Sequence, residues 1–358
     1  MRIREFLNRA SRGQGLSPGE VRILLKWSTA ENWLEIYDIA RNITETQFRK
    51  KLRFFAPLYF SSHCINDCDY CGFRSSNRTL KRKVLTEEEF LNEAQFLWNE
   101  GQRTLLLIAG EHPVYSGVGQ IASYVTALRR VGLDFSLMIE IAPLSVEDYA
   151  ILHELGINHC LLFQETYDRG TYAQIHHGKK RDYDWRLAAM ERALEAGIEN
   201  IGLGILIGLH PYQEDLVRLI EHAYRIKETL GRFPATFSFP RLRPAPGISF
   251  YQANTVSDEA FEKMLALTRL ACPDVGIVLT TREKPQFRKR LLQRGLGITH
   301  MSAGSSTLPG GYTVQNETGE NGQFELFDHR SLEEVEQEAR SLEYHRVPIN
   351  SRGLTRCR

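Results

Sequence analysis

Short apolar segments alternate with longer amphipathic segments along most of this 358-residue chain. The apolar segments are nearly continuous in Leu, Ile, Val and Phe, which is typical of parallel strands covered on both faces. We expect strands near residues 55–62, 104–109, 135–142, 158–164, 200–207, 235–240, 274–280 and 298–303. Eight strands alternating with helices over about 250 residues predict an α/β fold, a (β/α)8 TIM-type barrel. A doubly wound open sheet is the alternative.

The segments between the apolar runs have the end signals of helices. Thr86 precedes three glutamates, which suits an N-cap followed by acidic residues at the positive end of the helix dipole. Gly101 follows the same segment and suits the position after a helix C-terminus. The pattern predicts further helices at residues 184–196 and 214–230, each followed by a glycine.

The chain is long enough for two average domains, but a single barrel also reaches this length. Residues 1–50 are predicted to form a helical N-terminal extension, in which Ser17 and Pro18 begin a helix. We expect the barrel to cover residues 51–312. Residues 313–358 then form a C-terminal tail of loop and one short acidic helix near 331–342.

Charge and hydropathy exclude several classes of protein. The 45 Lys and Arg nearly balance the 44 Asp and Glu, so a nucleic-acid partner is not expected. The longest apolar runs, such as 105–109, are too short to span a bilayer. The first six residues are charged and lack the apolar core of a secretion signal. We therefore expect a cytoplasmic protein with no membrane partner.

Three of the six cysteines are clustered as Cys64-x3-Cys68-x2-Cys71, directly after the first predicted strand. Barrel enzymes build their active sites at that end of the strands. In a reducing compartment such a cluster indicates metal ligation, and thiolates favour zinc or iron–sulfur clusters. Structural zinc usually has four protein ligands, and His63 is poorly spaced to be the fourth. A non-enzymatic zinc-binding scaffold nevertheless stays open at this point.

The spacing of these cysteines, with Tyr70 before the third, resembles the signature of the radical S-adenosylmethionine (SAM) superfamily. The resemblance implies that Cys64, Cys68 and Cys71 hold one 4Fe-4S cluster and are essential for catalysis. The iron without a cysteine ligand would bind SAM, and one electron would cleave SAM to methionine and a 5′-deoxyadenosyl radical.

The resemblance extends to the ends of later strands. Ala109-Gly110-Glu111 is similar to the Gly-Gly-Glu motif that holds the SAM amino group, with Ala in place of the first Gly. Related maturases place a Glu and an Arg against SAM at the positions of Glu165 and Arg186, with the guanidinium on the SAM carboxylate. The alternative is that Arg186 is a solvated helix residue with no role in binding.

Further cofactor contacts are expected from Tyr70 and Phe73 in the cysteine segment, and from Glu140 and Gly204 in the third and fifth strands. Glu140 must be paired or hydrogen-bonded if it faces the barrel, whereas at a strand edge it would be solvated. Gly204 permits close approach to a ligand, although tight packing explains a glycine there almost as well.

Four longer motifs narrow the resemblance to the aromatic amino-acid lyases of this superfamily, above all the tyrosine lyases of thiazole biosynthesis. The motifs are residues 71–74, 164–167, 238–244 and 302–312. The resemblance implies cleavage of the Cα–Cβ bond of L-tyrosine to 2-iminoacetate and p-cresol, with 5′-deoxyadenosine and methionine, for thiamine synthesis. It also implies a thiazole synthase partner and a flavodoxin or ferredoxin reductant.

Two related activities are the alternatives. Tryptophan lyases share the barrel and the amino-acid site. The tyrosine lyases that mature iron-only hydrogenase have a second cluster in a C-terminal domain, whereas only Cys357 follows Tyr312 here. One thiolate cannot hold a second cluster alone, so that activity is disfavoured.

The substrate site is expected after the last two strands. By resemblance, Arg288 takes the tyrosine carboxylate and Ser305 assists, because a buried carboxylate needs a charge-assisted and preferably bidentate partner. The alternative is that Arg288 is one of several solvated cations on a basic helix. The basic segment 74–83 is interpreted as a lid or a docking surface for a partner protein.

Overall fold

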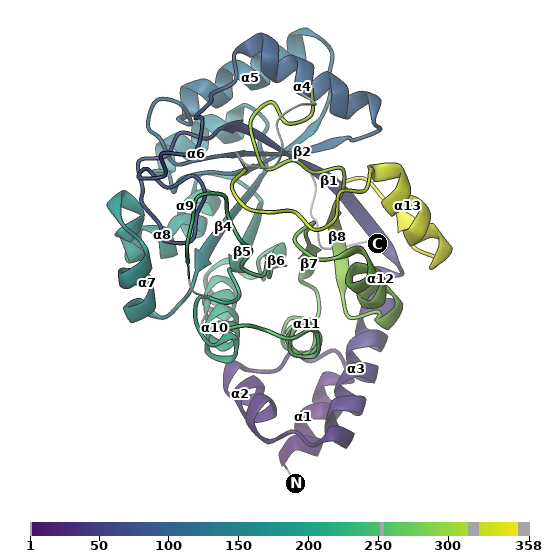
Figure 1. Cartoon of the computed structure of the whole chain (residues 1–358). Coiled ribbons are helices and arrows are strands. Elements are labelled where there is room, and N and C mark those ends of the chain that lie inside the picture. Colours follow the sequence, from purple (N-terminus) through teal and green to yellow (C-terminus); the bar gives the residue numbers. More distant parts are fainter. Residues whose placement is uncertain (1, 251–253, 314–321, 350–358) are drawn as a thin grey trace.

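A computed structural model of the chain describes residues 2–250, 254–313 and 322–349 (Figure 1). Eight parallel strands follow one another in the order β2 to β8 and then β1, and β1 also pairs with β2, which closes a barrel. The predicted (β/α)8 barrel is confirmed, and the open sheet is wrong. The strands are β1 (Lys51–Ser61), β2 (Thr104–Ala109), β3 (Ser136–Glu140), β4 (His159–Glu165), β5 (Asn200–Ile205), β6 (Thr236–Ser238), β7 (Gly276–Leu279) and β8 (Ile298–Ser302).

Helices surround the barrel. Thr86 caps the first of them through a reciprocal pair of hydrogen bonds with Glu89, as its sequence predicts. The helix expected at 184–196 is two shorter helices that meet at Ala188. The surrounding helices are α4 (Glu87–Asn99), α5 (Val118–Arg130), α6 (Val146–Glu154), α7 (Arg169–Ile175), the 3-10 turn η1 (Gly178–Arg181), α8 (Tyr183–Leu187), α9 (Ala189–Glu195), α10 (Tyr212–Leu230), α11 (Asp258–Ala271) and α12 (Pro285–Arg294).

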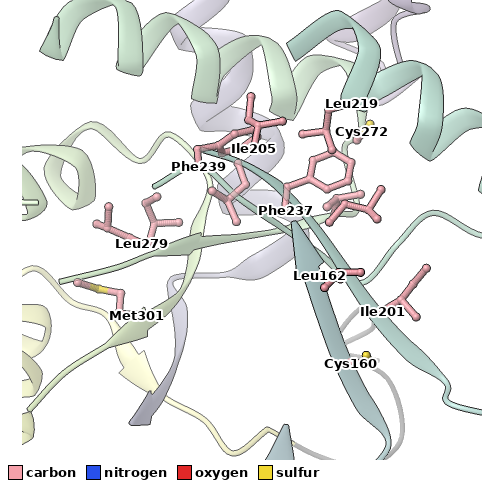
Figure 2. Packing of buried hydrophobic residues seen from close by; sticks show 14 of the residues in the cluster. Cys160, Leu162, Ile201, Ile205, Leu219, Phe237, Phe239, Cys272, Leu279 and Met301 are labelled. Atoms are coloured by element: carbon pink, nitrogen blue, oxygen red, sulfur yellow. The ribbon is translucent and has the colours of Figure 1, made fainter. Parts of the chain in front are cut away.

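The main core lies between the barrel strands and the helices. Figure 2 shows part of this layer, where Phe237 and Ile205 from the strands pack near Leu219 of α10. Cys160 and Cys272 are buried in the same core, so they act as small apolar side chains there. A second apolar cluster fills the barrel lumen, and most of its members come from five of the strands or, for Ala235, from the residue before β6: Phe55, Tyr59, Leu106, Ile108, Met138, Leu161, Ala235 and Val278.

The N-terminal extension is helical, as expected. It comprises α1 (Arg2–Ala10), α2 (Pro18–Trp27) and α3 (Ala30–Phe48), and it covers the side of the barrel formed by α10 and α11 (Figure 1). Ser17 and Glu20 cap the start of α2 reciprocally. Among the described helices, none is long and apolar enough to cross a membrane.

The C-terminal tail crosses the mouth of the barrel and then returns along its side. Residues 322–328, which we call the strap, hydrogen-bond to three separate segments: Gly72 N–H donates to Gln323 O at 3.0 Å, Glu325 N–H to Pro244 O at 2.9 Å, and Asp328 N–H to Thr281 O at 3.1 Å. The expected acidic helix is present as α13 (Leu332–Ser341). A short strand not expected from the sequence, β9 (His345–Arg346), pairs in parallel with the start of β1.

Candidate active site

The clustered cysteines lie on the loop that follows β1, which we call the cysteine loop (residues 62–76). Backbone hydrogen bonds fix this loop against the segment after β2 and the end of α7: Ile65 N–H donates to Glu111 O at 2.9 Å and Asp69 N–H to Ile175 O at 3.1 Å. The cysteine loop is therefore shaped by the fold itself, at the carboxyl ends of the strands where barrel enzymes place their chemistry.

All three cysteines of this loop are free thiols, with Cys68 buried and the other two partly exposed. Burial raises the pKa of each thiol, that of Cys64 to about 11. A metal centre supplies the positive charge that drives such thiols to the thiolate form. The positive charge of Lys180 acts in the same direction, because it lowers the pKa of Cys68 and of Cys71.

The loop fits a cluster better than a single zinc ion. Within residues 2–250, 254–313 and 322–349, no three His, Cys, Asp or Glu side chains are placed to hold one metal ion. His63 packs its ring on Tyr115, with centroids 4.5 Å apart. A cubane cluster binds each thiolate through a different iron, so its ligands need not converge on one point. The donor set of three thiolates thus suits the predicted 4Fe-4S cluster.

Polar and charged side chains at or after the ends of β1, β2 and β4 form a closed ring of contacts beside the cysteines. Arg186 of α8 donates to Glu111 at 2.8 Å, and its guanidinium lies 3.6 Å from Glu165. Lys180 donates to Glu165 at 2.7 Å, and its backbone N–H donates to the Asn66 side chain at 2.9 Å. Asn66 donates in turn to Glu111 at 2.7 Å. The ring joins the cysteine loop to the ends of β2 and β4.

Glu165 has an unusual backbone conformation within this ring. Its φ is 70°, which a residue with a side chain rarely adopts, and the pairing of β4 with β5 shifts register between Phe163 and Glu165. Such backbone strain persists only where many surrounding contacts hold the residue in place, and it is typical of functional sites. Here the bulge directs the carboxylate toward Lys180 and Arg186, whose positive charges lower its pKa against the effect of burial.

A cavity opens above the apolar lumen cluster, with about 980 Å³ of space between its atoms including the opening. That size is in the range of small-molecule sites. The cavity is lined by Cys71 of the cysteine loop and by Glu140, Glu165 and Lys180. Burial and the charge of Glu165 raise the pKa of Glu140 to about 7. Glu140 thus faces the cavity, and the alternative of a solvated strand edge is wrong.

Other expected cofactor residues lie beside this cavity. Tyr70 lines it, and its hydroxyl lies 2.9 Å from Nε2 of the buried His176. Phe73 is buried behind it and packs edge-on against Tyr59 at 5.9 Å. A Cβ atom on Gly110 would lie 2.4 Å from the carbonyl oxygen of His63, so the glycine lets the ends of β1 and β2 meet.

Gly204 and Ser305 differ in what they face. A Cβ atom on Gly204 would lie 2.5 Å from the ring of Phe163, so this glycine makes room for that ring, which itself lines the cavity. Ser305 lines the cavity directly, and its hydroxyl is buried with no protein hydrogen-bond partner among the described residues. The same holds for the hydroxyl of Ser238 at the end of β6.

Arg288 differs from the sequence expectation. Its guanidinium is fully buried on α12, forms an ion pair with the equally buried Asp328 of the strap, and donates to Ser302 O at 2.6 Å. It is neither a solvated cation nor part of the cavity lining. The reason is that α12 presents this side chain to the tail, whose position the sequence pattern did not indicate. The interaction anchors the strap to the barrel.

We therefore expect Arg288→Ala to lower the free energy of unfolding by about 3 kcal/mol, because the buried Asp328 keeps Arg330 but loses one of its two guanidinium partners, and Ser302 O loses its donor. Chemical denaturation of the two proteins measures the difference. Lys289→Ala, at an exposed position one residue later, should be within about 0.5 kcal/mol of the wild type. Equal stability of Arg288→Ala and Lys289→Ala would show that the buried pair does not hold the strap.

Three residues of the site were not predicted. Arg282 follows β7 in Thr280-Thr281-Arg282 and lines the cavity, and this place directly after a strand was a signal that the sequence offered. Lys180 and Gln323 also line the cavity. Gln323 lies on the strap, far along the chain from the barrel strands, so nothing local in the sequence placed it there.

Two known families match the chain, and their matches contain the residues of the site described above. Residues 58–223 match the radical SAM superfamily, and residues 238–345 match the biotin and thiamin synthesis associated domain. The first match begins within β1 and includes the cysteine loop and the ring of charged residues. The second includes Arg282, Ser305 and the strap.

Two enzymes and one solved structure are close relatives. The chain is 37% identical to 2-iminoacetate synthase of Salmonella typhimurium and 36% identical to that of Escherichia coli, in each case over 92% of this chain and 86% of the relative. A crystal structure of HydG, a maturase of the [FeFe]-hydrogenase, superposes with a TM-score of 0.90 and 39% identity, over 96% of this chain and 75% of that one.

Proposed function

Because the chain belongs to the 2-iminoacetate synthase family of radical SAM enzymes, we propose that it cleaves the Cα–Cβ bond of L-tyrosine. The products are 2-iminoacetate and p-cresol, with 5′-deoxyadenosine and methionine from SAM. This membership also excludes the zinc-binding scaffold that the cysteines alone left open.

Cys64, Cys68 and Cys71 would hold the 4Fe-4S cluster, and Glu111, Glu165 and Arg186 would hold the amino and carboxylate groups of SAM. When bound, the cluster and SAM would supply a carbon radical for abstraction of hydrogen from the substrate. The ring of charged residues suits this binding because SAM presents one ammonium and one carboxylate, and the ring offers carboxylates and a guanidinium fork at the mouth of the cavity.

One observation supports an amino-acid substrate most directly: Arg282 presents a largely buried guanidinium to the cavity without an ion-pair partner among the described residues. Its Cζ atom lies 3.3 Å from the ring centroid of Phe324 on the strap. Burial lowers the pKa of Arg282, and the nearby negative charges of Glu165 and Glu140 offset that effect only in part. A substrate carboxylate provides further negative charge, and the unpartnered hydroxyls of Ser305 and Ser238 can donate to it.

The remaining walls suit an aromatic side chain and a protected reaction. The lower cavity is apolar, with Phe55, Leu106, Leu161 and Val278 among its lining residues. Glu140, whose pKa is about 7, can hold or release a proton at its carboxyl oxygen close to neutral pH, inside the space where the substrate binds. The strap covers the mouth and so limits the entry of water.

The substrate assignment is tested by anaerobic turnover of the reconstituted enzyme with L-tyrosine and L-tryptophan in parallel. Formation of p-cresol from tyrosine, with no indole-derived product from tryptophan, supports the proposal. Preferential cleavage of tryptophan would replace it with the tryptophan-lyase alternative.

Gln323 gives the strap a role beside the cluster. Its side-chain Nε2 lies 3.8 Å from Sγ of Cys71, and its Oε1 accepts a hydrogen bond from Tyr59 at 2.8 Å, which fixes the orientation of the amide. Hydrogen bonds to cluster sulfurs raise the reduction potential, because they stabilise the more negative reduced state. Gln323→Leu is therefore expected to make the midpoint potential more negative.

An EPR-monitored redox titration of the reconstituted protein measures this shift without turnover. Gln102→Leu is the control, because Gln102 also donates a buried amide hydrogen bond, to Ala303 O at 2.9 Å, outside the cysteine loop. A potential that is the same in Gln323→Leu, Gln102→Leu and the wild type would contradict the assigned contact.

The partners and the location follow from the chemistry of the reaction. The imine product hydrolyses in water, so we propose a thiazole synthase that takes it up directly. SAM cleavage consumes one electron, which we assign to a flavodoxin or ferredoxin. A chain that needs reduced thiols for its cluster belongs in a reducing compartment, so we place it in the cytoplasm.

A further inference from the structure

Five charged side chains line the cavity at the mouth of the barrel, and three of them have ion-pair partners. Lys180 donates to Glu165 at 2.7 Å, and Arg243 donates to the buried Glu283, which lies outside the lining, at 3.0 Å. The five are Glu140, Glu165, Lys180, Arg243 and Arg282. The charges that are left for a ligand are therefore those of the remaining two, Glu140 and Arg282.

Glu140 and Arg282 lie on opposite sides of the cavity. Glu140 ends β3 and Arg282 follows β7, and these strands are four places apart in the closed barrel of eight. Each charge acts on the pKa of the other group, yet the two side chains form no ion pair with each other or with any residue that the structure describes. The space between them therefore has one end that suits a cation and one that suits an anion.

A free α-amino acid matches this arrangement because it carries two opposite charges on one carbon. Its carboxylate is assigned to Arg282 above, and its ammonium group needs an acceptor within reach of the same carbon. Glu165 is already engaged, since it accepts from Lys180 and lies 3.6 Å from Arg186. Glu140 is the carboxyl of the lining that has no such partner, and a charge-assisted hydrogen bond to an ammonium group is a strong contact.

We propose that Glu140 binds the ammonium group of the amino-acid substrate and accepts one proton from it during the reaction. The inference rests on the proposed function, because it assigns the second charge of that substrate. In the step, one N–H bond breaks and one O–H bond forms on the carboxylate, while the electron pair stays on nitrogen.

The hydrogen balance of the reaction requires such an acceptor. An ammonium nitrogen carries three hydrogens, whereas the neutral imine nitrogen of 2-iminoacetate carries one. A single carbon radical removes one hydrogen atom at most, so at least one hydrogen leaves the nitrogen as a proton. A carboxylate that already binds the ammonium group is placed to receive this proton.

This role differs from the cofactor contact that the resemblance implied for Glu140. The ring proposed to hold SAM contains Glu111, Glu165 and Arg186, and Glu140 forms no hydrogen bond to it in the part of the chain that the structure describes. Affinity for SAM and affinity for the substrate therefore separate the two roles.

The ionisation of Glu140 adds a pH signature. Its pKa is about 7, and only the ionised carboxylate binds an ammonium group, so kcat/KM for tyrosine should rise through pH 7 and level off above it. In Glu140→Gln this rise should be absent. The titratable and charged groups that act on Glu140 come from β1, β4, η1, α8 and the segment after β7: Tyr59, Cys160, Glu165, Lys180, Arg186 and Arg282.

The test compares L-tyrosine with 3-(4-hydroxyphenyl)propionate, which lacks only the ammonium group, by calorimetric titration of the reconstituted, oxidised enzyme with SAM bound. The wild type should bind tyrosine at least about tenfold more tightly than this analogue. Glu140→Gln keeps the shape but not the charge and should lower the preference below about threefold, with Glu140→Asp between the two. Glu154→Gln, an exposed change at the end of α6, should keep the wild-type preference.

Loss of the preference in Glu140→Gln supports the proposal. A wild-type preference in that variant would overturn it, because another group would then hold the ammonium. Weaker SAM binding with an unchanged preference would overturn it in favour of the cofactor contact, and a rise of kcat/KM through pH 7 in Glu140→Gln would overturn the proton transfer. The proposed function fails separately, as the absence of p-cresol in dithionite-driven turnover of the wild type, which does not affect the calorimetric preference.

Discussion

Cys68→Ala is expected to abolish formation of both 5′-deoxyadenosine and p-cresol while the barrel remains folded. The cluster loses one of its three protein ligands, and an incomplete ligand set does not retain a 4Fe-4S cluster in the form that binds SAM. The fold is little affected because Cys68 lies on the cysteine loop beyond β1, outside the main core. Iron content, the EPR signal of the reduced protein and the thermal transition measure the two effects separately.

The matched control is Cys160→Ala, because Cys160 is also a buried free cysteine but packs in the core between strand and helix (Figure 2). It should keep the cluster and the activity and lose some stability. Wild-type 5′-deoxyadenosine formation by Cys68→Ala would show that this cysteine is not a ligand.

Arg282→Ala is expected to weaken tyrosine binding by about 2–5 kcal/mol, which raises the KM for tyrosine roughly 30-fold or more. The loss is large because the substrate carboxylate would be left in the cavity without its guanidinium partner. SAM binding should change little, since the residues proposed to bind it, Glu111, Glu165 and Arg186, lie at other strand ends. Slow formation of 5′-deoxyadenosine should continue, uncoupled from tyrosine cleavage.

The variant Arg282→Lys separates the contribution of the positive charge from that of the guanidinium geometry. Lysine keeps the positive charge but not the planar fork, so its KM should lie between those of the wild type and Arg282→Ala. Steady-state kinetics with both products quantified measures these differences. An unchanged KM in Arg282→Ala would assign the carboxylate to another group.

The barrel could be predicted because its signals are local. Each of the eight strands is a short apolar run, and each lies where that run predicts it, as at 104–109 for β2. The predicted boundaries of helices and strands were less accurate where tertiary contacts set them. The helix expected at 184–196 breaks at Ala188, where Arg186 turns in to Glu111, and β9 exists only because it pairs with β1.

The site could be predicted only in part, because contacts between distant parts of the chain place some of its residues. The cysteines and Glu111 lie within a few residues after their strands and Glu165 ends β4, so position in the sequence located them. Arg288 and Arg282 are six residues apart, both beyond β7, and the pattern alone did not show which one faces the cavity. That choice depends on Asp328, which the tail brings against Arg288 from 40 residues away.

The most direct test of the central claim is one anaerobic reaction of the reconstituted wild-type enzyme with SAM, dithionite and L-tyrosine, with the products quantified by mass spectrometry. We predict that p-cresol, 5′-deoxyadenosine and methionine form in nearly equal amounts, together with 2-iminoacetate or the glyoxylate produced by its hydrolysis. Formation of 5′-deoxyadenosine without p-cresol, or no SAM cleavage by a protein that contains the cluster, would contradict the assignment.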